Sequence, residues 1–107
     1  GNFGALIDND TMSVTQMAPV FDNNRSLLFD MDAGQLKNTD WCIGTCAPRF
    51  GIDFISTARG MLTGDIRQDV EALRGFSFEQ HPRIKAEEAR IEALSAIVRE
   101  QVKRILD

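Results

Sequence analysis

An asparagine and an aspartate near the start of the chain have the side chains needed to bind a metal ion together. Asn2 lies just before a short apolar segment, and Asp22 directly follows Phe21 further along. Amide and carboxylate oxygens are ligands that Mg²⁺ accepts in proteins. Because protein-bound Mg²⁺ commonly holds and neutralises phosphate groups, this pair points to phosphoryl-transfer chemistry.

The residues between these two side chains predict a β-hairpin. Residues 3–7 are apolar apart from one glycine, residues 8–10 are turn formers, and residues 12–17 resume an extended pattern. In the general kinase pattern, a catalytic-loop Asn and a later Asp beside Phe both reach metal. A short hairpin would deliver Asn2 and Asp22 to one point in the same way.

The residues around both positions resemble one kinase family. Gly1-Asn2-Phe3-Gly4, followed by Ala18-Pro19-Val20-Phe21-Asp22-Asn23, is similar to the catalytic segment of HipA-like bacterial serine/threonine kinases. The resemblance is strongest over residues 1–29, and it implies that Asn2 and Asp22 are Mg²⁺ ligands. It also implies that the parent protein transfers phosphate from ATP to protein Ser or Thr, and that it is a toxin paired with an antitoxin.

Several parts of the kinase pattern have no counterpart in this sequence. The catalytic Asp of the pattern stands five residues before the Asn, which places it upstream of Gly1. The Gly-rich loop and the strand Lys belong to a separate N-lobe. We therefore expect a C-lobe fragment that is inactive alone and binds neither Mg²⁺ nor ATP tightly. Its expected partner is the missing N-lobe, with an antitoxin or self-association as further candidates.

Two further carboxylates follow the motif. Asp30 and Asp32 flank Met31, and they could assist metal binding or select a basic substrate, although turn residues are the commoner role. The Asp-x-Asp spacing does not continue as an EF-hand loop, because Trp41 stands where the bidentate Glu is required. The Asp8-x-Asp10 segment does not match an EF-hand loop either, because Met12 stands at the fifth position, where an oxygen ligand is required.

The sulfur and imidazole side chains do not form a recognisable metal signature. Cys42 and Cys46 are the only cysteines and His81 is the only histidine. Their spacing matches no standard zinc motif, and a fourth ligand cannot be identified. We interpret both cysteines as reduced, structural thiols and assign His81 no role.

The remaining pattern predicts a mainly α-helical protein with a short N-terminal β-hairpin, resembling part of a protein-kinase C-lobe. We expect one domain, residues 1–107, with the hairpin and metal motifs in 1–29, a loop region in 30–51 and helices in 52–107. Gly64 is expected to end a first helix and Asp65 to cap a second. Pro82 is expected to open a final helix that runs to about Leu106.

Composition restricts the remaining function classes. The chain has 107 residues, 43% of them hydrophobic, and a formal net charge of −4. That charge gives no electrostatic reason to expect a nucleic-acid partner, and no apolar run reaches the roughly 20 residues that a membrane span needs. We expect a cytoplasmic protein. The competing hypothesis is a small helical interaction module without catalytic activity, in which Asn2 and Asp22 are turn residues.

Overall fold

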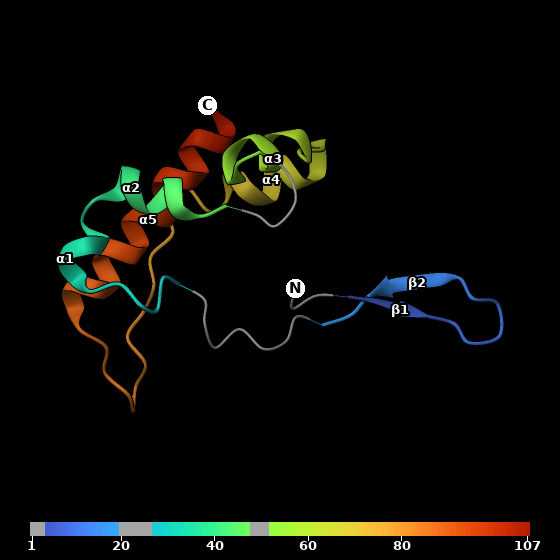
Figure 1. Cartoon of the computed structure of the whole chain (residues 1–107), viewed down its shortest axis with the longest axis horizontal. Coiled ribbons are helices and arrows are strands. Elements are labelled where there is room, and N and C mark those ends of the chain that lie inside the picture. The colour runs from blue at the N-terminus through green and yellow to red at the C-terminus, as the bar shows by residue number, and fades with distance from the viewer. Residues whose placement is uncertain (1–3, 20–26, 48–51) are drawn as a thin grey trace.

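The computed structural model describes residues 4–19, 27–47 and 52–107. Within these ranges a two-stranded hairpin is followed by helices α1 to α5, so the expected class, mainly helical with an N-terminal hairpin, is confirmed. Figure 1 shows the hairpin projecting away from helices that gather around α5. The radius of gyration is 16.4 Å, whereas a compact chain of this length would have about 13 Å. The projecting hairpin accounts for the elongated shape.

The hairpin pairs β1 (Ala5–Ile7) with β2 (Val14–Met17) in antiparallel register. Its turn is organised by Asp8, whose Oδ1 accepts hydrogen bonds from the backbone N–H groups of Asp10 and Thr11, both at 2.9 Å. Both bonds lower the pKa of Asp8, and the bond from the N–H of Thr11 has the larger effect. The turn therefore forms where the polar residues 8–10 predict it.

The segment expected to be a loop region, residues 30–51, contains two helices, so that expectation is wrong for much of its length. They are α1 (Ala33–Leu36) and α2 (Thr39–Thr45). Asp32 and Gln35 form a capping box at the start of α1, and Asn38 caps α2 by accepting from the N–H of Trp41. Local capping by polar side chains, together with burial of one apolar face, outweighs the loop-like composition.

The next two helices begin and end at other residues than the glycine pattern indicates. α3 (Phe54–Gly60) is capped by Asp53, and α4 (Gly64–Glu71) is capped by Thr63. Gly64 is therefore the first residue of α4 and does not end α3. Asp65 lies in the first turn of α4, where the helix dipole stabilises its negative charge.

The final helix, α5 (Glu88–Leu106), starts later than Pro82. The Nδ1 atom of His81 accepts from the N–H groups of Arg83 and Ile84, both at 3.1 Å, and this closes a non-helical turn. The side chain of Gln80 then bonds both backbone groups of Ala86. These side-chain bonds occupy the backbone that an earlier helix would have used.

The core lies along α5, which contacts each of the four other helices. Its apolar residues are buried against side chains of α1 and α2, and partly buried residues from α3 and from two connections pack against the edges of this core. The main cluster consists of Leu36, Cys42, Ile43, Ala93, Leu94 and Ile97. The hairpin contributes nothing to this cluster, because every residue of its two strands is exposed.

A buried hydroxyl links the core of α5 to the preceding connection. Ser95 is fully buried; its Oγ accepts from the N–H of Phe78 at 2.9 Å and donates to the carbonyl of Ile91 at 2.8 Å. Ser95→Ala leaves the Phe78 N–H without its partner, so we expect a loss of about 1–3 kcal/mol in the free energy of unfolding. Urea denaturation measures this loss. Ser77→Ala, at an exposed serine, is the control, and equal effects of the two variants would contradict the prediction.

Candidate functional site

Both predicted metal ligands, Asn2 and Asp22, lie outside the described residues. The structure does describe the hairpin that separates them. Beyond the end of β2, the N–H of Ala18 donates to the carbonyl of Gly4 at 2.8 Å, so pairing continues past the strands. Asn2 precedes Gly4 by two positions and Asp22 follows Ala18 by four. The hairpin thus brings the two flanking segments to a common starting point.

On the C-terminal side of the motif, the chain returns to the helical body through a turn held by hydrogen bonds. The N–H of Met31 donates to the carbonyl of Leu28 at 3.0 Å. Arg90 of α5 donates from Nη2 to the same carbonyl at 3.0 Å and from Nη1 to the carbonyl of Met31. Leu28 and Met31 also pack against the core cluster. This turn is the point at which the motif region is attached to the helices.

The two carboxylates near the motif differ in their roles. Asp32 accepts the N–H of Gln35 at 2.7 Å, and its own N–H donates to Oε1 of Gln35, so its side chain is engaged as a helix cap. Asp30 is exposed. Among the described residues, no group of three or more His, Cys, Asp and Glu side chains could hold a metal ion.

The two cysteines are free thiols inside or beside the core. Cys42 is fully buried and donates to the carbonyl of Gln35 at 3.5 Å, while Cys46 is half-buried and donates to the carbonyl of Cys42 at 3.3 Å. Burial raises the pKa of both thiols, because desolvation disfavours the thiolate. His81 is exposed and engaged in its local turn. This geometry agrees with structural thiols.

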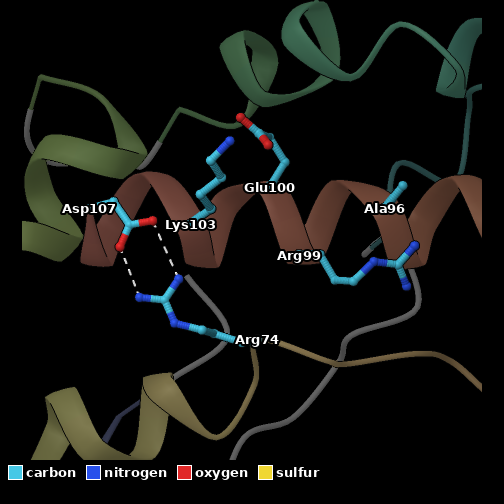
Figure 2. Close-up of a pocket in the computed structure, with 6 residues that line it drawn as sticks. All are labelled: Arg74, Ala96, Arg99, Glu100, Lys103 and Asp107. Carbon is cyan, nitrogen blue, oxygen red and sulfur yellow. Dashed lines mark hydrogen bonds and ion pairs between the residues drawn. The ribbon is translucent and has the colours of Figure 1, made fainter.

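A charged pocket of about 490 Å³ lies beside the C-terminal half of α5. Figure 2 shows Arg74 facing Asp107 in a two-point contact, with Nη2 to Oδ1 at 2.8 Å and Nη1 to Oδ2 at 3.4 Å. Arg74 also pairs with Glu71, and Arg99 donates to the carbonyl of Phe76 at 3.0 Å. The lining residues are Arg74, Ala96, Arg99, Glu100, Lys103 and Asp107.

These ion pairs connect Arg74, which follows α4, to Glu71 at the end of α4 and to Asp107 after the end of α5. The hydrogen bond to Asp107 is the main cause of the raised pKa of Arg74, and the same bond lowers the pKa of Asp107. The pair therefore stabilises the fold above the ordinary pKa of Asp, and that contribution is lost as pH falls through the lowered pKa. Since both partners are largely exposed, the contribution is small.

Two other arginine side chains bind carbonyl groups in the last turn of α5. Arg59 donates from Nε to the carbonyl of Arg104 at 2.8 Å, and Arg67 donates from Nη1 to the carbonyl of Leu106 at 3.5 Å. The last carbonyls of a helix have no partner within it and carry a partial negative charge. α3 and α4 therefore each supply a cation that caps the final turn. Sequence reasoning missed these contacts because the partners are far apart along the chain.

Comparison with family models, with curated proteins and with solved structures gave no match to this chain. Among the described residues, no helix combines the length and apolar character that crossing a membrane requires.

Proposed function

We propose that the chain is part of the C-lobe of a HipA-like serine/threonine kinase and that Asn2 and Asp22 are its Mg²⁺ ligands. The observation that supports this proposal is the hairpin, closed by the hydrogen bond between Ala18 and Gly4. A kinase metal site needs its Asn and Asp ligands close together, because both hold metal ions against the same phosphate groups. The resemblance around Asn2 and Asp22 supplies the residue types.

In this proposal the side chains have separate tasks. The amide oxygen of Asn2 and the carboxylate of Asp22 would hold the ion, and the carboxylate would supply the negative charge of this ligand pair. The chemistry that a bound Mg²⁺ would supply is neutralisation of phosphate charge during transfer from ATP to a protein hydroxyl. The catalytic Asp, the Gly-rich loop and the phosphate-binding Lys come from other parts of the kinase. We therefore expect this chain alone to be inactive.

The partner that we propose first is the remainder of the kinase, including its N-lobe. The hairpin supports the need for a partner, because its apolar side chains are exposed to solvent. The exposed fractions are 66% for Val14, 65% for Met17 and 51% for Ile7. An isolated two-stranded hairpin is marginally stable in water, and packing against another layer stabilises it. An antitoxin or a second copy of the chain would be alternative partners.

A helical interaction module is the second candidate. The exposed apolar hairpin favours it as well, since a projecting apolar surface can bind a protein without any metal. The two candidates differ in what they require of Asn2 and Asp22. A kinase needs both oxygen ligands, whereas the module uses them only as turn residues.

A titration with Mn²⁺, in competition with Mg²⁺, separates the two candidates. In ¹⁵N-labelled protein we expect paramagnetic broadening centred on the amide signals of Asn2 and Asp22, because both side chains would touch the ion. Excess Mg²⁺ should reverse the broadening. Asp22→Asn should weaken Mn²⁺ binding at least about tenfold, as loss of a charged ligand exceeds the usual effect of losing its hydrogen-bonded neighbour.

The control is Asp10→Asn, which removes the same charge from an exposed position in the hairpin turn. It should leave the broadening at Asn2 and Asp22 unchanged. Broadening that is equal in wild type and Asp22→Asn, or that centres on Asp10, would refute the metal site and favour the interaction module.

A further inference from the structure

The hairpin has two open edges within the described part of the chain. The described residues form one sheet, and that sheet contains only β1 and β2. Figure 1 shows both strands projecting away from the helices. The outer edge of a strand presents backbone N–H and C=O groups that can pair with a further strand. Because sheets gain stability with three or more strands, such pairing would also stabilise the hairpin.

The two edges differ in regularity. In the register of the hairpin, Leu6 pairs with Gln16 and Ile7 pairs with Val14, so Thr15 is an extra residue on β2. The hydroxyl of Thr15 donates to the carbonyl of Leu6 at 3.1 Å. Such a bulge disrupts the ladder locally, and bulges are among the features that protect a strand edge from pairing. β1 has no extra residue, so its edge is the better one for a further strand.

The backbone groups at the open edge of β1 belong to Ala5 and Ile7. The carbonyl of Gly4 and the N–H of Asp8 each form a hydrogen bond with a residue that flanks β2, at 2.8 and 2.9 Å respectively. Along an antiparallel strand, residues that bond to the partner strand alternate with residues that do not. Gly4, Leu6 and Asp8 therefore direct their backbone groups toward β2. The N–H and C=O groups of Ala5 and Ile7 face outward.

These outward groups are complementary to themselves, and we propose that the chain pairs with a second copy of itself through the edge of β1. In antiparallel register with Leu6 opposite Leu6 of the second copy, Ala5 of each copy lies opposite Ile7 of the other. Each of these pairs exchanges two backbone hydrogen bonds. The arrangement has the two-fold symmetry of the commonest protein dimers and merges the two hairpins into one sheet. It goes beyond the proposed function and does not depend on the metal site.

The charges of the hairpin favour the same arrangement. β1 and β2 contain no charged residue, so no side chain of either strand repels a second copy or protects the edge by its charge. The charged residues of the segment 4–19 are Asp8 and Asp10, both at the turn. Parallel pairing would bring the carboxylates of the two copies together, whereas antiparallel pairing places the two turns at opposite ends of the sheet. A second β1 therefore meets this edge without repulsion.

Pairing through β1 also brings apolar side chains together at its centre. Leu6 is 41% exposed in the single chain. Opposite residues that are not hydrogen-bonded to each other have the closest side chains in an antiparallel pair, and the two Leu6 residues occupy that position in the proposed register. Because β1 is only three residues long, the interface is small. We therefore expect weak, reversible association and not a permanent dimer.

Sedimentation equilibrium and ¹⁵N NMR of the whole chain, from about 10 μM to about 1 mM, test the pairing. We expect the average mass to rise toward that of a dimer, and hydrogen exchange at the Ala5 and Ile7 amides to slow as the concentration increases. Ala5→Pro removes an outward N–H at the first residue of the strand, where proline is tolerated. Association should weaken at least about fivefold, because each dimer loses two hydrogen bonds.

The matched control is Met17→Pro. Met17 pairs with Ala5 in the hairpin, so its N–H faces outward from the other edge, that of β2. This variant should associate as the wild type does. For both variants, slow hydrogen exchange at the Ala18 amide, which donates to the carbonyl of Gly4, shows that the hairpin remains formed.

A charge exchange at Leu6 tests the register without proline. Leu6→Lys or Leu6→Glu places like charges directly opposite each other in the dimer, so each variant alone should associate more weakly than the wild type. An equal mixture of the two variants should regain association, because opposite charges then face each other across the two-fold axis. If Ala5→Pro disrupts the hairpin, these variants carry the comparison.

The outcomes separate this pairing from other contacts. An average mass that does not change with concentration would overturn it. Association that Ala5→Pro and the Leu6 variants leave unchanged, or that Met17→Pro weakens as much as Ala5→Pro does, would overturn the role of the β1 edge. Weaker association of each Leu6 variant alone, with recovery in the mixture, supports the antiparallel register.

Discussion

Leu36→Ala should lower the free energy of unfolding by about 2–5 kcal/mol, which is the range for removing a buried leucine from a packed core. Leu36 ends α1 and has no exposed surface. It belongs to the cluster in which α1 and α2 meet α5. Because the helix that carries it is only one turn long, little else attaches that helix to the core. The loss should therefore fall in the upper part of the range.

Urea denaturation followed by circular dichroism measures this loss. Leu73→Ala makes the same chemical change at a side chain that is 42% exposed and should cost less than about 1 kcal/mol. A similar loss in the two variants would mean that α1 is not packed on α5 as the structure shows. The comparison is independent of the proposed function, since neither leucine belongs to the metal motif.

Asp22→Asn should reduce phosphoryl transfer by about a hundredfold or more in the complete kinase that the proposed function requires. The charged ligand compensates the charge of Mg²⁺ and fixes it against the phosphates, an effect of several kcal/mol. Each 1.36 kcal/mol corresponds to about a tenfold change in rate. Transfer of radiolabelled γ-phosphate from ATP to protein, measured at saturating Mg²⁺ and ATP, reports the effect on the catalytic step.

Asp32→Asn is the matched control for this experiment. It makes the same change in a side chain that serves as a helix cap, and asparagine caps helices about as well as aspartate. We expect nearly unchanged transfer and stability. An Asp22→Asn protein that keeps most of its activity would show that Asp22 is not a metal ligand, whatever the reaction of the complete protein.

The parts of the fold that sequence could predict depend on local patterns. The hairpin follows from alternating apolar residues around the polar turn at Asp8, and the final helix follows from its apolar stripe. The predictions were wrong where hydrogen bonds from side chains to the backbone, and not the local composition, decide where a helix begins. Asp32 and Asn38 begin helices in a segment whose composition is typical of loops, and His81 and Gln80 hold the connection in which an earlier helix start was expected.

The candidate site could likewise be predicted only in part from the sequence. The residue types and order at Asn2 and Asp22 are visible in the sequence, and the hairpin between them could be predicted. The two hydrogen bonds from Arg90 and the two-point contact between Arg74 and Asp107 could not be predicted, because each joins residues from distant segments. One sequence contains no signal for such pairs until the helices are packed.

The central position of α5 also determines the order in which the protein can fold. Helices α1 to α4 are synthesised before α5, yet each of them packs on it. These helices therefore lack their shared core until α5 has followed, and their early contacts are limited to local turns and the contact between α1 and α2. Because the defining contacts are long-range in sequence, their formation requires closure of long loops. Nascent chains that stop short of α5 should thus be readily cleaved by proteases.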